Sequence, residues 1–211
     1  MITKEQLVEE VKKNEIYTSL VRKAIKQAEK SHANQSRDDG SSNLYTHIYP
    51  VAYSILKRYK GEKNLEDLVI LALLHDTMED DENFDNSVCF KIFNKSICEN
   101  VKKLTKDERS FRNYSGSNKY VYELLKFFCN KEYIENVKDA SEICKIVKLE
   151  DRLNNLRGIE KVGGSLKNFR YIIESETLFI SMAKKTKSFN YIPLLKKEIK
   201  RLSLHTPKTA T

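Results

Sequence analysis

The stretch LALLHDTMED, residues 71–80, joins an apolar run directly to a group of ionisable side chains. Four apolar residues are followed by His75 and Asp76, and Glu79 and Asp80 come one turn later. Residues three and four positions apart share a helix face, so these four side chains would converge if one helix continues through Asp80. Carboxylates gathered at an apolar helix end are costly to bury unless positive charge lies beside them. Histidine with carboxylates is a normal ligand set for divalent manganese, iron or zinc, so the stretch indicates a metal site; the alternative is a solvated helix end.

The composition predicts a globular protein with one sizeable core. The chain has 211 residues, of which 40% are hydrophobic and 32% are charged. No run of about eighteen apolar residues occurs, so we expect no membrane span. The charged N-terminal stretch lacks the apolar centre of a signal peptide, so we expect a cytoplasmic protein. The four cysteines show no metal-binding spacing, and we expect reduced thiols.

The net charge of +8 is compatible with several kinds of anionic partner. Charges of both signs are scattered along the chain, with no block of like charges and no basic run interleaved with aromatic residues. We therefore expect no nucleic-acid partner; a small anionic substrate is compatible with this charge, and a bias of the composition toward lysine would explain it equally well. The sequence does not predict the oligomeric state.

Hydrophobic periodicity and the scarcity of breakers predict an all-α fold. The chain contains 6 glycines and 3 prolines, and no segment alternates strictly between apolar and polar residues. Asn64 is expected to cap the apolar helix, and Pro50 is tolerated in the first turn of its helix. The predicted helices span residues 4–13, 16–32, 46–60, 64–79, 87–93, 95–104, 118–129, 139–157, 166–185 and 190–203.

Further ligands for a cation would have to come from other parts of the chain. His47 begins a predicted helix, although a lone histidine there is more often a hydrogen-bonded surface or core residue. The stretch IVKLEDRLNNLRGI, residues 146–159, places Asp151 and Asn155 four positions apart on one helix face. A charged surface helix with internal ion pairs would show the same spacing.

Taken together, these motifs resemble the HD phosphohydrolase superfamily, and within it the hydrolase part of Rel/Spo-type enzymes and the small alarmone hydrolases. The four stretches that carry the resemblance are AIKQAEKSHANQSRDDG (24–40), HIYPVAYSIL (47–56), LALLHDTMED (71–80) and KLEDRLNNLR (148–157). The likeness covers about residues 16 to 203. It implies a single HD-domain helical bundle of about 8–11 helices over residues 1–203, followed by a flexible tail over 204–211.

The resemblance also implies a chemistry. The side chains of His47, His75, Asp76 and Asp151 would bind one divalent metal ion, typically manganese. Glu79 and Asp80 would handle the attacking water and its proton. Arg37 and Asn155 match positions that contact substrate. The reaction would be hydrolysis of the 3′-pyrophosphate of (p)ppGpp, giving GDP or GTP and pyrophosphate.

Two alternatives stay open at this stage. One is an HD phosphohydrolase that acts on another nucleotide, such as a nucleoside monophosphate, a dinucleotide or a triphosphate. The other is a binding module that keeps the fold without turnover. The sequence departs from the family pattern at Asp38, Asn154 and Gly158, near the expected nucleotide contacts, whereas the expected metal ligands are intact.

Overall fold

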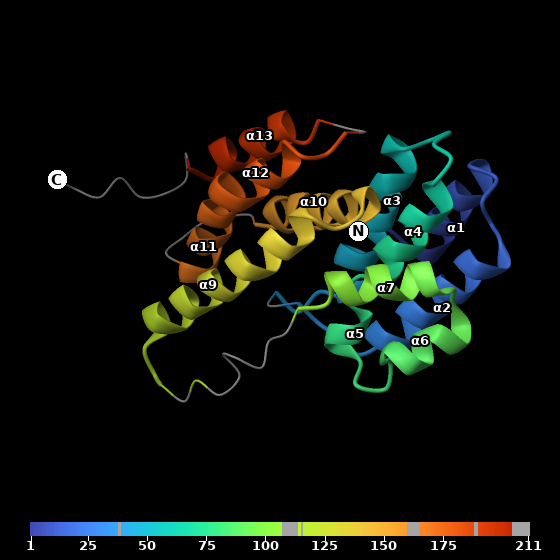
Figure 1. Ribbon diagram of the computed structural model, residues 1–211, viewed down its shortest axis with the longest axis horizontal. Coiled ribbons are helices and arrows are strands. Elements are labelled where there is room, and N and C mark those ends of the chain that lie inside the picture. The colour runs from blue at the N-terminus through green and yellow to red at the C-terminus, as the bar shows by residue number, and fades with distance from the viewer. Residues whose placement is uncertain (38, 107–113, 115, 160–164, 188–189, 204–211) are drawn as a thin grey trace. The chain divides into compact units, whose positions relative to one another are not determined.

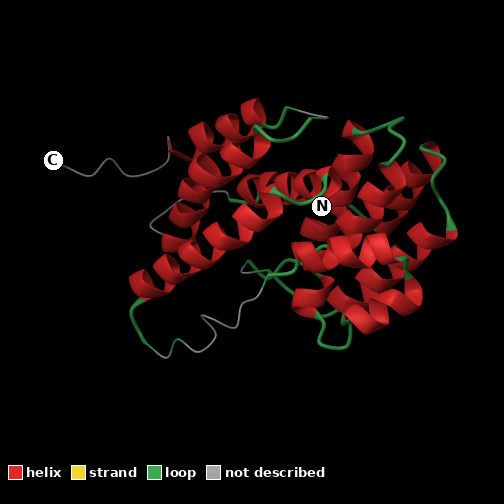
Figure 2. Ribbon diagram, viewed as in Figure 1, coloured by secondary structure: helices red, strands yellow, loops and turns green. Residues whose placement is uncertain are grey.

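The computed structural model is built from helices (Figures 1 and 2). It describes the whole chain except residues 38, 107–113, 115, 160–164, 188–189 and 204–211. In the described part the only β-type pairing is an isolated bridge between Ser36 and Ser42, so the all-α prediction is confirmed there. The predicted tail over 204–211 and Asp38 lie outside the described residues. None of the helices that are described is long and apolar enough to cross a membrane.

The chain divides into two compact units, residues 1–105 with 146–151, and residues 106–145 with 152–211. One helix, α10, contributes to both units. The prediction of a single domain over residues 1–203 therefore stays a prediction, and each unit is described by itself.

The first unit is organised around the apolar helix α4. Its helical elements are α1 (Lys4–Lys13), α2 (Ser19–His32), the π-helical turn η1 (Leu44–Ile48), α3 (Tyr49–Arg58), α4 (Leu65–Leu74), α5 (Thr77–Asp80), α6 (Asn86–Ile92) and α7 (Lys95–Leu104). Every residue from Leu68 to Leu74 is buried. A helix that is apolar on all sides has to be covered on all sides, and α2, α3 and α7 pack against α4.

Several predicted helix bounds in this unit are wrong. The predicted helix 64–79 ends at Leu74, and α5 begins only at Thr77. The side chain of Asn64 makes no capping hydrogen bond, although the residue precedes α4. Pro50 lies in the first turn of α3, as predicted.

The expectation of reduced cysteines is wrong for two of the four. Cys89 and Cys98 form a disulfide between α6 and α7, with their Cα atoms 5.7 Å apart. The helices are joined by a short break at Phe93, which folds α7 back beside α6 and brings the two thiols together. Cys129 and Cys144 are free.

The second unit contains α9 (Lys119–Lys138), α11 (Leu166–Glu174), the π-helical turn η2 (Ser175–Phe179), α12 (Ile180–Ala183) and α13 (Ile192–Ser203), with both ends of α10 (Glu142–Arg157). The predicted helix 118–129 continues to Lys138, and α10 begins only after Ser141, whose hydroxyl accepts from the backbone N–H of Cys144. A serine that caps a helix fixes its first residue better than hydrophobic periodicity does.

A buried ionic network joins the helices of the second unit. The fully buried carboxylate of Glu174 accepts hydrogen bonds from Asn130 at 2.7 Å, Arg170 at 2.6 Å and Arg152 at 2.8 Å. Arg170 also donates to Glu123 at 2.6 Å. Such bonds satisfy a charge that would otherwise be costly to bury, and they link α9, α10 and α11.

The central section of α10 is held in the first unit by apolar packing and an ion pair. Ile146, Val147 and Leu149 are fully buried, and the Nε of Arg58 at the end of α3 lies 2.8 Å from the Oε2 of Glu150. The side chain of Glu150 is 1% exposed. This pair therefore fixes the turn of α10 that carries Asp151.

Replacing Arg58 tests this attachment. Arg58→Met leaves the Glu150 carboxylate buried without its guanidinium partner, and we expect the free energy of unfolding to fall by about 3 kcal/mol in urea denaturation. The matched control is Lys57→Met on the same helix, whose ion pair with Glu10 involves a lysine side chain that is 52% exposed. That control should lose about 1 kcal/mol or less. Equal losses in the two variants would contradict an anchoring role for Arg58.

Candidate metal centre

His47 reaches the site from the π-helical turn η1. This turn runs directly into α3, and the imidazole of His47 is 3% exposed. A π-helical turn adds a residue to the normal helical repeat and so changes the direction of the side chains within it; such turns are frequent at functional sites. The sequence placed His47 at the start of an ordinary helix and did not predict this turn.

The break between α4 and α5 brings His75 and Asp76 together. Consecutive residues on a continuous helix point about 100° apart. After Leu74 the chain leaves the helix, Asp76 takes φ −104° and ψ −1°, and its Oδ2 lies 3.2 Å from the Nε2 of His75. The expectation that one helix continues through Asp80 is therefore wrong, and the break itself allows two adjacent residues to face one point.

A hydrogen bond to the backbone fixes the orientation of the His75 ring. Its Nδ1 lies 2.8 Å from the backbone carbonyl of Ala72 and donates to it, because a carbonyl oxygen can only accept. In the neutral ring the Nε2 then carries a lone pair directed at His47. This is the arrangement in which histidines bind metal ions in proteins.

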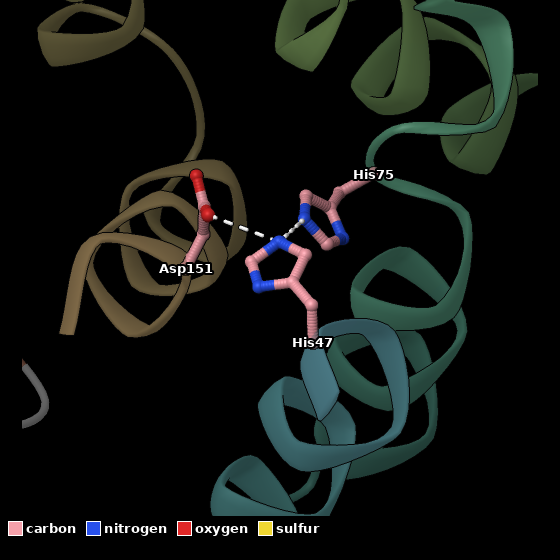
Figure 3. Close-up of side chains that lie close together, drawn as sticks. All are labelled: His47, His75 and Asp151. Atoms are coloured by element: carbon pink, nitrogen blue, oxygen red, sulfur yellow. Dashed lines mark hydrogen bonds and ion pairs between the residues drawn. The ribbon is translucent and has the colours of Figure 1, made fainter. Parts of the chain in front are cut away.

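Asp151 approaches from α10 and completes the cluster. Its Oδ1 lies 3.3 Å from the Nε2 of His47 (Figure 3). Its Oδ2 lies 2.7 Å from the Nζ of Lys148. Both side chains of this ion pair are buried. Lys148 was not among the predicted site residues, although its spacing of three residues from Asp151 on a helix was sufficient to suggest it.

The candidate ligand atoms beside His47 lie at distances that are compatible with a shared metal ion. The Nε2 of His47 lies 3.3 Å from the Nε2 of His75 and 3.5 Å from the Oδ2 of Asp76. Ligands that lie about 2.1 Å from one ion are separated by about 3.0–3.4 Å in octahedral or tetrahedral geometry. One ligand atom from each of His47, His75 and Asp151 lies within 4.8 Å of the other two, so these three buried residues form a group that could hold a metal ion.

The charges of the cluster show the same need for a cation. Burial opposes the protonated form of His47, but hydrogen bonds and charges from Asp151 and Asp76 outweigh it and raise the pKa of His47 to about 9. Burial opposes the charged form of Asp76, yet His75 and His47 hold its pKa well below the usual range. The pKa of His75 is raised as well, by Asp76 and Asp151 and against the effect of burial, so the acids favour protonated imidazoles beside them.

The two acids after the break lie on the short helix α5. Glu79 is half-buried, and the side chain of Asp80 is 26% exposed. Burial and the charge of Asp76 raise the pKa of Asp80. A carboxyl group with a raised pKa is better suited to carry a proton near neutral pH than an ordinary aspartate.

The two predicted substrate contacts lie in different units. Arg37 is in the loop between α2 and η1, where its backbone N–H donates to the carbonyl of Ser41 at 2.8 Å and its own carbonyl accepts from Gly40 at 2.9 Å. Gly40 has φ +80°, a conformation that glycine adopts without strain. Asn155 is half-buried on α10, four residues after Asp151.

Comparison with known proteins confirms the resemblance that the motifs suggested. No family model matches the chain. The guanosine-3′,5′-bis(diphosphate) 3′-pyrophosphohydrolase MESH1 of Danio rerio is 26% identical over 145 residues, which is 68% of this chain and 71% of that protein. A probable guanosine-3′,5′-bis(diphosphate) 3′-pyrophosphohydrolase of Mycoplasma genitalium is 33% identical over 144 residues. That match covers 67% of this chain but only 18% of the Mycoplasma protein.

A solved structure shares the fold. It is described as a metazoan ortholog of SpoT that hydrolyses ppGpp and plays a role in starvation responses. The TM-score is 0.65 at 22% identity, and the likeness covers 87% of this chain and 96% of the other. The predicted all-α HD-domain fold is thereby confirmed.

The raised pKa of His47 predicts how the metal-free protein responds to pH. A group whose pKa is higher in the folded protein contributes stability that is complete below its unfolded pKa and lost as pH rises through its folded pKa. For His47 this window runs from 6.5 to about 9. We expect the free energy of unfolding, measured with a chelator present, to fall by about 3 kcal/mol from the acid to the alkaline end of that window.

The control for this prediction is His47→Gln, which has no titratable ring. The variant should show a clearly smaller pH dependence; the remainder would come from His75, whose pKa is raised against the effect of burial by Asp76. An unchanged slope in the variant would show that His47 does not carry the proton.

Proposed function

We propose that the protein is a metal-dependent hydrolase that removes the 3′-pyrophosphate of (p)ppGpp, giving GDP or GTP and pyrophosphate. The observation that supports the proposal is the buried group of His47, His75 and Asp151, beside which Asp76 lies; neighbouring nitrogen and oxygen atoms are 3.2–3.5 Å apart. The names of the two curated relatives supply the substrate class. We propose the cytoplasm as the compartment.

The four ligands would hold one divalent cation, which we propose to be manganese. Two carboxylates and two imidazoles suit Mn²⁺, whereas a closed thiolate set would favour zinc. When bound, such an ion lowers the pKa of a water molecule and offsets negative charge on a phosphoryl group. Lys148 neutralises the second oxygen of Asp151 and keeps the first one directed at the cluster.

The acids on α5 would move the protons. In the proposed reaction the oxygen of water bonds to the phosphorus next to the ribose, and the bond from that phosphorus to the 3′-oxygen breaks. Glu79 would accept the proton of the attacking water, and Asp80 would hold or return a proton as the 3′-oxygen leaves. The raised pKa of Asp80 supports its part in this division of roles.

Arg37 and Asn155 are the proposed substrate contacts. A guanidinium group can bond two phosphate oxygens at once, so Arg37 suits the polyphosphate. The amide of Asn155 can donate to a ribose or phosphate oxygen. Neither residue type selects guanine, and the choice of base therefore rests on the relatives and not on these side chains.

Two substitutions separate metal binding from proton transfer. Asp76→Ala removes a ligand, so bound metal and activity should disappear together. Glu79→Gln keeps the ligand set, so metal should stay bound while turnover falls by about 10²–10⁴, the range for a general acid–base group. Metal content after dialysis and steady-state rates are the measurements.

The exposed Glu82 provides a control for these variants. Glu82→Gln removes a carboxylate from the same polar segment and should leave both metal content and turnover unchanged. Loss of metal in Glu79→Gln would show that Glu79 is a ligand and that its proposed role is wrong.

A nucleotide panel tests the substrate. We expect manganese-dependent release of pyrophosphate from ppGpp, with GDP as the other product, and little turnover of GTP, dGTP, a nucleoside monophosphate or a dinucleotide tetraphosphate. A chelator should abolish the reaction, and added manganese should restore it. If ppGpp stays intact while another nucleotide is hydrolysed, the proposed substrate is wrong and the hydrolase class stands.

A further inference from the structure

A chain of hydrogen bonds runs behind the acid Asp80. Asn43 donates its Nδ2 to the Oε1 of Gln35 at 2.7 Å, and the Nδ1 of His32 lies 2.6 Å from the same oxygen. The Nδ1 of His32 is also 3.6 Å from the Oδ2 of Asp80. The side chain of Gln35 also acts on Asp80, since hydrogen bonding from Gln35 opposes the rise in the pKa of the Asp80 carboxyl.

The chemistry of Gln35 fixes the direction of every bond in this chain. Its Oε1 can only accept, so Asn43 and the Nδ1 of His32 must both donate to it. The remaining polar group of Gln35 is its amide nitrogen, which can only donate, and the carboxylate of Asp80 is its acceptor. His32 therefore carries its ring proton on Nδ1, on the side that faces Gln35 and Asp80.

The burial of His32 is not explained by stability. The residue is completely buried, and its Nε2 has no hydrogen-bond partner among the described residues. A buried acceptor without a donor costs free energy, so an apolar side chain of similar size would be more favourable here. Burial lowers the pKa of His32 against the effects of Gln35, Asp76 and Asp80, which keeps the ring neutral with a single N–H.

We propose that His32 and Gln35 are positioning residues that hold the carboxylate of Asp80 in its working orientation. This inference rests on the proposed function, in which Asp80 handles a proton. It assigns a role to His32, the last residue of α2, and to Gln35 in the following loop that also carries Arg37, on a different part of the chain from the proposed metal ligands.

Asp80 needs such support because of where it lies. It is the last residue of the four-residue helix α5, and Asp81 already has extended backbone angles. Proton transfer requires a geometry held within about 0.5 Å, which such a short helix does not provide by itself. The ring of His32, whose Nδ1 lies 3.6 Å from the Asp80 Oδ2, and the side chain of Gln35 restrain the carboxylate without placing a fixed positive charge beside it. The helix α5 also packs against α2.

The test is a double-mutant cycle between Gln35 and Asp80. Gln35→Leu keeps a side chain of similar size and removes the donor and the acceptor together. We expect kcat to fall at least tenfold, with KM changed less than twofold and metal content unchanged. In the Asp80→Asn background the same substitution should change kcat less than twofold, because there is no longer a carboxylate to position.

Matched variants separate positioning from general loss of structure. His32→Asn can present an Nδ2 donor close to the position of the ring Nδ1, so it should keep more of kcat than His32→Leu does. If Gln35→Leu does not fold, the comparison of His32→Asn with His32→Leu tests the inference in its place. Ser31→Ala is the control: it removes a 2.7 Å hydrogen bond from the same helix end to the neighbouring Asp81 and should leave kcat unchanged.

Two outcomes would overturn the inference. One is a double variant whose fold-loss in kcat equals the product of the fold-losses of the two single variants, which would show that the two residues act independently. The other is a crystal structure of metal-loaded Gln35→Leu in which Asp80 keeps its wild-type orientation. The structure needs no substrate, so it decides the inference even if the wild-type protein leaves ppGpp intact, a result that would count against the proposed function alone.

Discussion

A carboxylate that is buried needs positive charge close to it, and the arrangement of side chains in the candidate metal centre follows from this need. Asp76 and Asp151 lie beside two buried imidazoles, and each acid keeps a pKa well below its usual range only because cations are close to it. For Asp76 these are His75 and His47, and for Asp151 they are Lys148 and His47. A metal ion held by His47, His75 and Asp151 would supply positive charge at the same place.

Local departures from regular helix serve this arrangement. The helix α4 ends at Leu74, and the break lets His75 and Asp76 face the same point. The π-helical turn η1 directs His47 toward them, and the pair of Arg58 with Glu150 holds the turn of α10 that carries Asp151. On an uninterrupted regular helix, the side chains of His47, His75 and Asp76 would point in other directions.

The geometry of the cluster bears on metal binding, whereas the similarity to ppGpp hydrolases bears on the identity of the substrate. The buried group of His47, His75 and Asp151 could hold a metal ion. The relatives supply the nucleotide, since neither Arg37 nor Asn155 is a side chain that selects a base. The proposed support of Asp80 by His32 and Gln35 concerns a third question, the orientation of the proton-carrying acid.

The sequence by itself determined the all-α class, because helical periodicity and few breakers are properties of the chain alone. It also identified His47, His75, Asp76 and Asp151 as candidates through motif order. It did not give the break after Leu74, the π-helical turn at His47, or the continuation of α9 to Lys138, since hydrophobic periodicity does not distinguish a break in a helix from its continuation. The contact of Asp151 with His47 joins residues 104 positions apart. Only tertiary packing decides such a contact, because the apolar face of α10 must be buried before its carboxylate can meet the imidazole.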